Sequence, residues 1–324
     1  MDILLQKLHI FDNIKNIIKE RDVNYFTFEH INRNPTFDKG LSIIMTSHNR
    51  SKQVYFTLQT IQNSKNKNVQ VILIDDSTTD KVDTSVLKNF DIWITLISIK
   101  NENKIWVNPC VNYNIGFSFI EGEKVIIQNS EVCHVGDVCE FIKDNLSDNK
   151  YLVFDVRAVA DFDGNERVYN SYYDDDTLFF ALNKLSIYRT NTPNGWYQHS
   201  FYCPKNYHFL TAIMKKDLEI VGGFSLDYSF AGSYDDDDLI MKIKMLNLDI
   251  INIHNEKHKV GGIHLFHQSA GSSWENISLT EQLNKTLFQR KMFFVINKGE
   301  YIELSSNDNN RRQREMLRRL MRLV

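Results

Sequence analysis

Short apolar runs at regular intervals constrain the fold of this chain more than any other feature of its sequence. The runs are rich in Val, Ile and Leu, have the length of buried strands, and occupy residues 41–45, 69–74, 92–99, 125–127 and 151–154. The segments between them have the apolar spacing of helices and occupy residues 54–61, 82–90, 111–119 and 138–146. These repeated strand-helix-strand units predict an α/β fold built on a doubly wound, mostly parallel sheet.

The two ends of the chain differ from this α/β region. Apolar residues at helical spacing predict a helical N-terminal extension over residues 1–40. Residues 301–324 are expected to form a basic amphipathic tail, since residues 311–324 hold six arginines and one glutamate. One face of a helix there would carry Leu317, Leu320, Met321 and Val324. Such a helix fits an anionic membrane surface, a partner protein, or the acidic body of the chain itself.

Composition excludes several classes of protein. With 42% hydrophobic and 24% charged residues, the chain can form a large core and is not of the disordered class. Its longest apolar runs fall far short of the roughly 20 residues that a transmembrane helix needs. The first residues lack the pattern of a signal peptide, so we expect a cytoplasmic protein. Outside the tail no basic patch is interleaved with aromatic residues, so we expect no nucleic-acid partner.

Polar residues follow the predicted strands in a suggestive order. The first strand is followed by residues 46–50, the second by residues 75–80, and the fourth by residues 128–131. In a doubly wound sheet the ligand binds at the carboxyl ends of the strands, so Asp76 and Glu131 are expected at one edge. Neither a G-x-G-x-x-G fingerprint nor a P-loop is present, which removes the main support for dinucleotide binding and for P-loop phosphate binding.

Several of these segments resemble a known family. LSIIMTSHNR, VILIDDSTTD, NPCVNYNIGF and KVIIQNSEV, in this order, resemble the nucleotide-sugar half of family 2 glycosyltransferases, which have the Rossmann-like GT-A fold. The later blocks VGGF, YDDDDLIMKIKMLNL and HLFH resemble the acceptor half of that family and of the β-1,4-galactosyltransferases. The resemblance implies a GT-A catalytic domain over residues 41–300, with a nucleotide-sugar half at 41–150 and an acceptor half at 151–300.

The resemblance also implies an activity. The chain would move a hexose from a nucleotide diphosphate donor, most often a UDP-sugar, to a hydroxyl of a glycan or protein-linked acceptor. Transfer would invert the anomeric carbon. Two other functions stay open: a non-catalytic nucleotide-sugar-binding or scaffold protein, and a sugar nucleotidyltransferase that would release pyrophosphate.

Four positions match family residues that hold the nucleotide. Thr46 and Asp76 match the residues that hold uracil and ribose, and a carboxylate can accept the uracil N3–H. Asn49 and Arg50 would approach the ribose or the diphosphate. For Arg50, a solvated surface position is an equal alternative.

The family's metal motif, D-x-D, corresponds here to Asn129-Ser130-Glu131. The resemblance makes Glu131 a ligand of Mn²⁺ or Mg²⁺, while Asn129 can only hydrogen-bond a ribose hydroxyl. His264 and His267 have the separation of a downstream ligand pair in β-1,4-galactosyltransferases, and nitrogen ligands favour Mn²⁺ over Mg²⁺. Residues three apart on a strand face opposite sides, so His267 is favoured and His264 is second.

The acidic run at residues 235–238 precedes an amphipathic segment and suits the N-terminus of a helix, where negative charge is favourable. We assign that role to two of the four acids. The resemblance places the catalytic base at Asp236, with Asp235 as the near alternative.

Three further residues are candidates for contact with the sugar or the acceptor. Gly222 and Gly223 would let a substrate approach the backbone, or would form a turn. Trp196 would stack on a sugar face, or would pack in the core.

Overall fold

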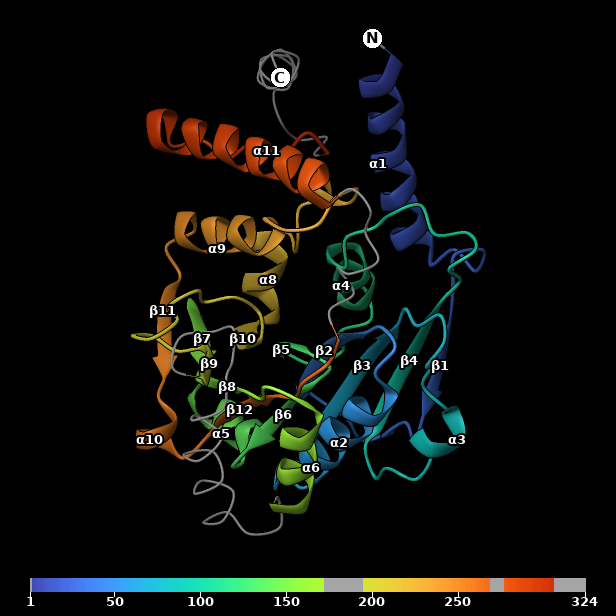
Figure 1. Cartoon of the computed structure of the whole chain (residues 1–324), viewed down its shortest axis with the longest axis vertical. Coiled ribbons are helices and arrows are strands. Elements are labelled where there is room, and N and C mark those ends of the chain that lie inside the picture. Colours follow the sequence, from blue (N-terminus) through green and yellow to red (C-terminus); the bar gives the residue numbers. More distant parts are fainter. Residues whose placement is uncertain (1, 172–194, 269–276, 306–324) are drawn as a thin grey trace.

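The computed structural model describes residues 2–171, 195–268 and 277–305 (Figure 1). The predicted helical stripe at Leu317, Leu320, Met321 and Val324 lies outside these residues. Among the described residues, no helix has both the length and the apolar character that crossing a membrane requires.

The core of the fold is a mixed eight-stranded sheet. Its strands, in spatial order, are β1 (Phe26–Ile31), β4 (Trp93–Ile99), β3 (Val69–Asp75), β2 (Leu41–Ser47), β5 (Lys124–Asn129), β10 (Leu210–Met214), β7 (Lys150–Phe154) and β11 (Asp249–Ile253). Strands β4, β3, β2 and β5 are parallel, and β10 runs antiparallel between β5 and β7. The sheet changes direction of winding at β2, so the predicted doubly wound α/β fold is confirmed.

Several strands of the structure were not predicted, and one of them falls within the predicted helical extension. Within residues 1–40 only α1 (Asp2–Glu20) is helical, and Phe26–Ile31 forms β1, which pairs antiparallel with β4. Only the two end residues of this strand, Phe26 and Ile31, are buried. The segment therefore lacks the alternation of apolar and polar residues that marks a half-buried strand, and backbone pairing at the sheet edge decides its conformation.

Helices cover both faces of the sheet (Figure 1). One face packs against helices that include α4 (Cys110–Phe117), α8 (Lys215–Val221) and α9 (Asp235–Met245), with α1 and α11 (Ile277–Lys298) outside them. The other face packs against α2 (Ser51–Gln62), α3 (Thr84–Leu87) and α5 (Val138–Asn145). Alternate residues of the same strand serve the two cores, as Ile43 and Ile44 do in β2.

A smaller four-stranded sheet joins distant parts of the chain. It contains β6 (Val132–Val135), β12 (Gly261–His264), β8 (Val156–Ala158) and β9 (Trp196–Gln198). Because β12 is antiparallel to β6, His264 pairs with Val132, and the Leu265 N–H donates to the carbonyl of Glu131. The end of β12 is therefore fixed beside the turn that follows β5.

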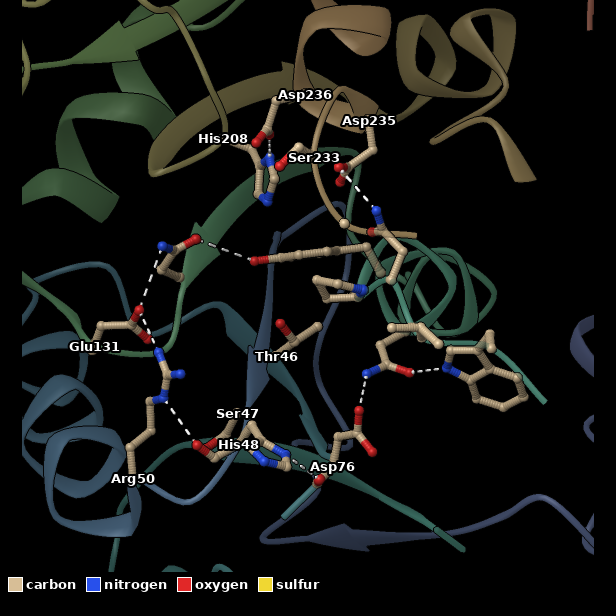
Figure 2. Close-up of a pocket in the computed structure, with 18 of the residues that line it drawn as sticks. Thr46, Ser47, His48, Arg50, Asp76, Glu131, His208, Ser233, Asp235 and Asp236 are labelled. Atoms are coloured by element: carbon tan, nitrogen blue, oxygen red, sulfur yellow. Dashed lines mark hydrogen bonds and ion pairs between the residues drawn. The ribbon is translucent and has the colours of Figure 1, made fainter. Parts of the chain in front are cut away.

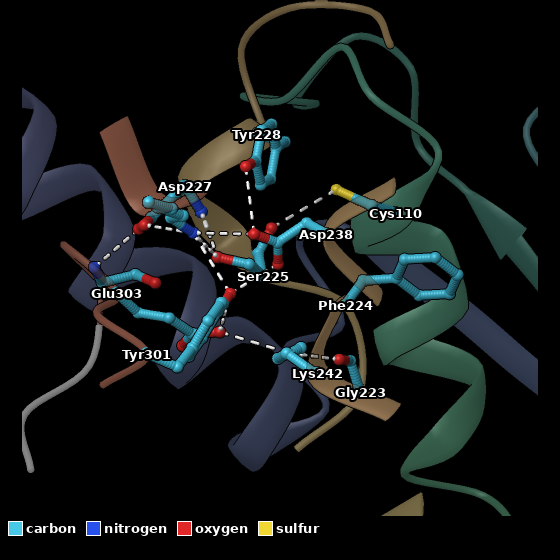
Figure 3. Close-up of polar contacts among 12 residues, drawn as sticks. Cys110, Gly223, Phe224, Ser225, Asp227, Tyr228, Asp238, Lys242, Tyr301 and Glu303 are labelled. Carbon is cyan, nitrogen blue, oxygen red and sulfur yellow. Dashed lines mark hydrogen bonds and ion pairs between the residues drawn. The ribbon is translucent and has the colours of Figure 1, made fainter. Parts of the chain in front are cut away.

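A buried charge network ties the C-terminal helix to this core (Figure 3). The Lys291 ammonium, in α11, lies 2.9 Å from the Asp227 carboxylate and 3.3 Å from the Asp238 carboxylate. Tyr301 donates to Asp238 at 2.5 Å, and the backbone N–H groups of Leu304 and Ser305 donate to Asp227. Asp227 lies in the short 3₁₀ helix η2 (Leu226–Tyr228) and Asp238 lies in α9, so one ammonium group holds three elements together.

Replacing Lys291 tests this network. Lys291→Met leaves two buried carboxylates without their cation, so we expect a loss of about 3–5 kcal/mol in the free energy of unfolding. Urea denaturation followed by circular dichroism measures it. The control is Lys285→Met, an exposed lysine of the same helix, which should change stability by less than about 0.5 kcal/mol. Equal stabilities of the two variants would contradict the role of the network.

Candidate functional site

A cavity of about 680 Å³ lies at the carboxyl ends of β2, β3 and β5 (Figure 2). These strands are parallel and adjacent, so the residues that follow them meet at one edge of the sheet. The predicted site residues in its wall are Thr46, Arg50, Asp76, Asn129, Glu131, Asp235, Asp236 and His267. Residues that are far apart in the sequence are thus brought to one cavity.

One end of the cavity is formed by the buried carboxylate of Asp76. Its Oδ2 atom accepts hydrogen bonds from Lys104 Nζ at 2.5 Å and from Asn112 Nδ2 at 2.9 Å. The Trp106 indole N–H in turn donates to Asn112 Oδ1 at 2.8 Å. The other oxygen, Oδ1, is buried and has no partner among the described residues. A buried carboxylate oxygen without a donor is an acceptor available to a ligand N–H.

Glu131 occupies the middle of the cavity wall, in the turn between β5 and β6. Its Oε1 atom lies 2.5 Å from Arg50 Nη1 and 3.2 Å from the Nε2 atoms of both His264 and His267. Burial alone would raise the pKa of Glu131, but the Arg50 guanidinium and the two histidines hold it well below its ordinary value. Glu131 is therefore a buried, ionised carboxylate.

The geometry of these three side chains fits a divalent metal ion. Neighbouring ligands in an octahedral site with bonds of about 2.1 Å lie about 3.0 Å apart, close to the separations at Glu131. The Nδ1–H of His267 donates to the carbonyl of Gln268 at 3.0 Å, which leaves Nε2 with a free lone pair toward Glu131. Both histidines reach the carboxylate because β12 ends at His264 and the chain turns before His267.

A second cluster, Asp155, His199 and His254, has similar spacing but a different proton arrangement. Nδ1 of His199 accepts the backbone N–H groups of Phe201 and Tyr202, at 3.0 and 3.2 Å. The neutral ring therefore carries its proton on Nε2, the atom that faces Asp155, and this nitrogen cannot bind a metal. The hydrogen bonds around the two clusters distinguish a candidate metal site from a structural polar cluster.

The four acids at the start of α9 divide into two pairs with different surroundings. Asp237 accepts the Tyr207 hydroxyl at 2.7 Å, and Asp238 belongs to the Lys291 network. Asp235 and Asp236 instead line the cavity. Burial, and then the charge of Asp236, raise the pKa of Asp235 to about 7.

The loop before this helix is held in an unusual conformation. Ser233 and Tyr234 have φ angles of 69° and 67°, a region that residues other than glycine rarely adopt. The buried amide of Asn284, in α11, donates to the carbonyls of Ala231, Gly232 and Ser233 at 3.0 to 3.1 Å. These hydrogen bonds fix the direction in which Asp235 and Asp236 enter the cavity.

Five predicted site residues lie outside the wall of this cavity, and one of them, His264, contacts Glu131. Asn49 has a structural role, because its Oδ1 accepts the backbone N–H groups of residues 78, 79 and 80. Trp196 is buried with the Arg157 guanidinium 3.5 Å from its ring centroid. Gly222 is the left-handed C-cap of α8, and a Cβ on Gly223 would lie 2.6 Å from the Asn114 side chain. A turn and close packing account for both glycines.

Sequence reasoning missed His208. This residue lies two positions before β10, which runs antiparallel to β5, so Leu210 pairs with Gln128. In an antiparallel strand the residue before the strand, not the one after it, lies at the ligand edge. Nδ1 of His208 contacts Oδ1 of Asp236 (Figure 2). The sequence signal that could have identified it is a histidine just before the apolar residues of this strand.

A family model for glycosyl transferase family 2 matches residues 42–216, which contain β2, β3, β5 and the turn at Glu131. The chain belongs to glycosyl transferase family 2. It is therefore a glycosyltransferase with a GT-A fold. No curated protein sequence matches the chain.

The chain is similar to solved structures of two glycosyltransferases. Residues 1–349 of S. aureus TarS, in complex with UDP-GlcNAc, are 15% identical, with a TM-score of 0.51 over 86% of this chain and 70% of that chain. The mannosyltransferase PcManGT from Pyrobaculum calidifontis, in complex with GDP-Man and Mn²⁺, is 14% identical, with a TM-score of 0.44 over 93% of this chain and 76% of that chain. At this identity the likeness to TarS shows a shared fold alone.

Titration with Mn²⁺ tests the candidate metal site. Glu131→Gln removes the ionised ligand, so we expect the Mn²⁺ affinity to fall by more than about tenfold, since even outer partners of metal ligands are worth 10–100-fold. Calorimetry or electron paramagnetic resonance measures it. The control Asp155→Asn alters the second cluster and should leave the affinity unchanged. Loss of Mn²⁺ binding in Asp155→Asn alone would contradict the assignment.

Proposed function

We propose that the chain is an inverting glycosyltransferase that moves a hexose from a UDP-sugar to a hydroxyl of a glycan or protein-linked acceptor. One observation carries the proposal: a single cavity has an unpartnered carboxylate oxygen at Asp76, a cation-binding carboxylate at Glu131, and two acids at Asp235 and Asp236. These groups lie in one cavity, and they are the groups needed to recognise a nucleobase, to neutralise the charge of a diphosphate and to remove the proton of an acceptor hydroxyl.

The proposed donor is a UDP-sugar. The free Oδ1 of Asp76 would accept the N3–H of uracil, and Thr46 would bind the base edge or the ribose. Cytosine offers no N–H at that position, so a carboxylate there disfavours it. The complex of S. aureus TarS with UDP-GlcNAc supports a UDP-sugar at this fold.

The proposed mechanism is a single displacement. Asp236, with Asp235 as the near alternative, provides the basicity that removes the acceptor proton as its oxygen attacks the anomeric carbon. Arg50 faces the cavity beside Glu131 and would bind the diphosphate. A Mn²⁺ or Mg²⁺ ion held by Glu131, His267 and His264 would supply positive charge to the departing nucleoside diphosphate.

We also propose that the acceptor half is organised like that of β-1,4-galactosyltransferases. The support is the position of the two histidines, whose Nε2 atoms both lie 3.2 Å from Glu131 although the sequence places them more than 130 residues later.

A second function has some support, namely nucleotide-sugar binding without catalysis. Asn129 brings no charge to the metal motif, and Arg50 already neutralises Glu131. A binding protein, however, has no need for two acids at the far side of the cavity.

A nucleotide-sugar panel tests the proposed function directly. With Mn²⁺ present and no acceptor, we expect slow release of nucleoside diphosphate from one UDP-sugar, and its loss when EDTA is added. Release is followed by a coupled assay for the diphosphate. Binding of a UDP-sugar without hydrolysis would favour the binding-protein alternative, and neither binding nor hydrolysis of any donor would refute the proposal.

Replacing Asp236 separates catalysis from binding. Asp236→Asn should lower turnover by about 10²–10⁴-fold, the usual contribution of general base catalysis, with UDP affinity nearly unchanged. The matched control is Asp237→Asn, one residue along the same helix, whose carboxylate binds the Tyr207 hydroxyl. If both variants lose turnover equally, the effect comes from the fold of the helix and not from a base at Asp236.

A further inference from the structure

We infer that His208 is the group that receives the acceptor proton, with Asp236 holding the ring and stabilising its charge. This inference rests on the proposed glycosyl transfer and adds a catalytic residue to it. The atom that accepts the proton is then Nε2 of His208, and Asp236 acts through the ring.

The packing of His208 leaves the ring one orientation. It lies two residues before β10, is 7% exposed, and meets the rings of Tyr113 and Phe224 edge-on at 4.6 and 4.9 Å. Nδ1 contacts Oδ1 of Asp236, and Figure 2 shows the other nitrogen directed away from Asp236 into the cavity. No hydrogen bond of the described residues uses this Nε2.

The contact with Asp236 leaves one nitrogen of the imidazole free for a substrate. The Asp236 oxygen that meets the ring, Oδ1, is buried, and Nε2 of His208 faces the space where substrate must lie. A carboxylate that orients an imidazole fixes its tautomer, so the neutral ring carries the proton on Nδ1 and a lone pair on Nε2. This is the arrangement of a base and the group that orients it.

The charges around the ring strengthen it as a proton acceptor. Burial lowers the pKa of His208, but Asp236, Asp235 and Glu131 more than offset this effect, so the pKa lies above its ordinary value. The Tyr113 hydroxyl, from α4, adds no charge because burial raises its pKa far above neutrality. A raised pKa makes the neutral imidazole a stronger proton acceptor at Nε2.

The proposed glycosyl transfer needs no reactant other than the donor and the acceptor. The acceptor oxygen forms a bond to the anomeric carbon as the bond from that carbon to the diphosphate oxygen breaks, and the nucleoside diphosphate leaves with the electron pair. The acceptor proton moves to Nε2 of His208, and Asp236 stabilises the imidazolium until solvent removes the proton. In the absence of an acceptor, water takes the same position.

The decisive variant is His208→Asn. The asparagine amide occupies the place of Nδ1 and can still donate to Asp236, but the proton-accepting Nε2 atom is gone. We expect hydrolysis of the UDP-sugar identified by the panel to fall by about 10²–10⁴-fold, while calorimetry gives UDP binding within about threefold of the wild type. The double variant with Asp236→Asn should be no slower than either single variant, because the two residues act as one unit.

Two further readouts distinguish a base from a structural residue. In the wild type, hydrolysis should increase as the pH rises through the raised pKa of His208, because only the neutral ring accepts a proton. In His208→Asn the residual activity should lose this limb. In His208→Ala, added imidazole should restore activity at least about tenfold, and it should have no effect on Asp236→Asn.

Retention of full hydrolysis by His208→Asn would overturn the inference, and so would an unchanged pH limb with no rescue by imidazole. Either result would leave Asp236 as the direct base and the proposed function intact. Failure of the wild type to bind or hydrolyse any donor would instead refute the proposed function itself.

Discussion

The orientation of the acids in the cavity depends on one buried ammonium group. Lys291 is fully buried between Asp227 and Asp238, and a charge in that position is stable only with its partners in place. Asp238 is in the first turn of α9, three residues after Asp235, so the network that neutralises Lys291 also fixes the start of this helix. Asn284 holds the preceding loop from the same face of α11, seven residues earlier. The C-terminal helix therefore fixes the start of α9 through these contacts, and it also adds Glu281 to the wall of the cavity.

Strand direction is the second constraint. The parallel strands β2, β3 and β5 deliver the residues that follow them, and the antiparallel strand β10 delivers the residue that precedes it. Pairing of β12 with β6 then brings His264 and His267 to Glu131. One carboxylate oxygen thus faces three nitrogen atoms from different parts of the chain, an arrangement that only the folded topology can produce.

The sequence predicted the part of this site that follows from local periodicity. Apolar runs located β2, β3, β4, β5 and β7, and the polar residues after two of these strands, such as Asp76 and Glu131, line the cavity. It could not predict β1, whose exposed middle hides its pattern, or His208, because the antiparallel direction of β10 is not encoded in local spacing. Asn49 looked like a ligand-binding residue because polar residues in such turns have two uses. Here its side-chain oxygen accepts hydrogen bonds from three backbone N–H groups of the neighbouring loop.

Opposite pKa shifts within one cavity separate two kinds of chemistry. Glu131 faces a guanidinium and two imidazoles, so its pKa lies well below the ordinary value and it stays ionised. Asp235 faces another carboxylate in a buried position, and its pKa rises to about 7. Groups of the same type with pKa values moved apart mark different roles. The Glu131 end attracts and holds positive charge, whereas the Asp235 end exchanges protons near neutral pH. His208 belongs to the second end, because its raised pKa and its contact with Asp236 place a second proton-exchanging group there.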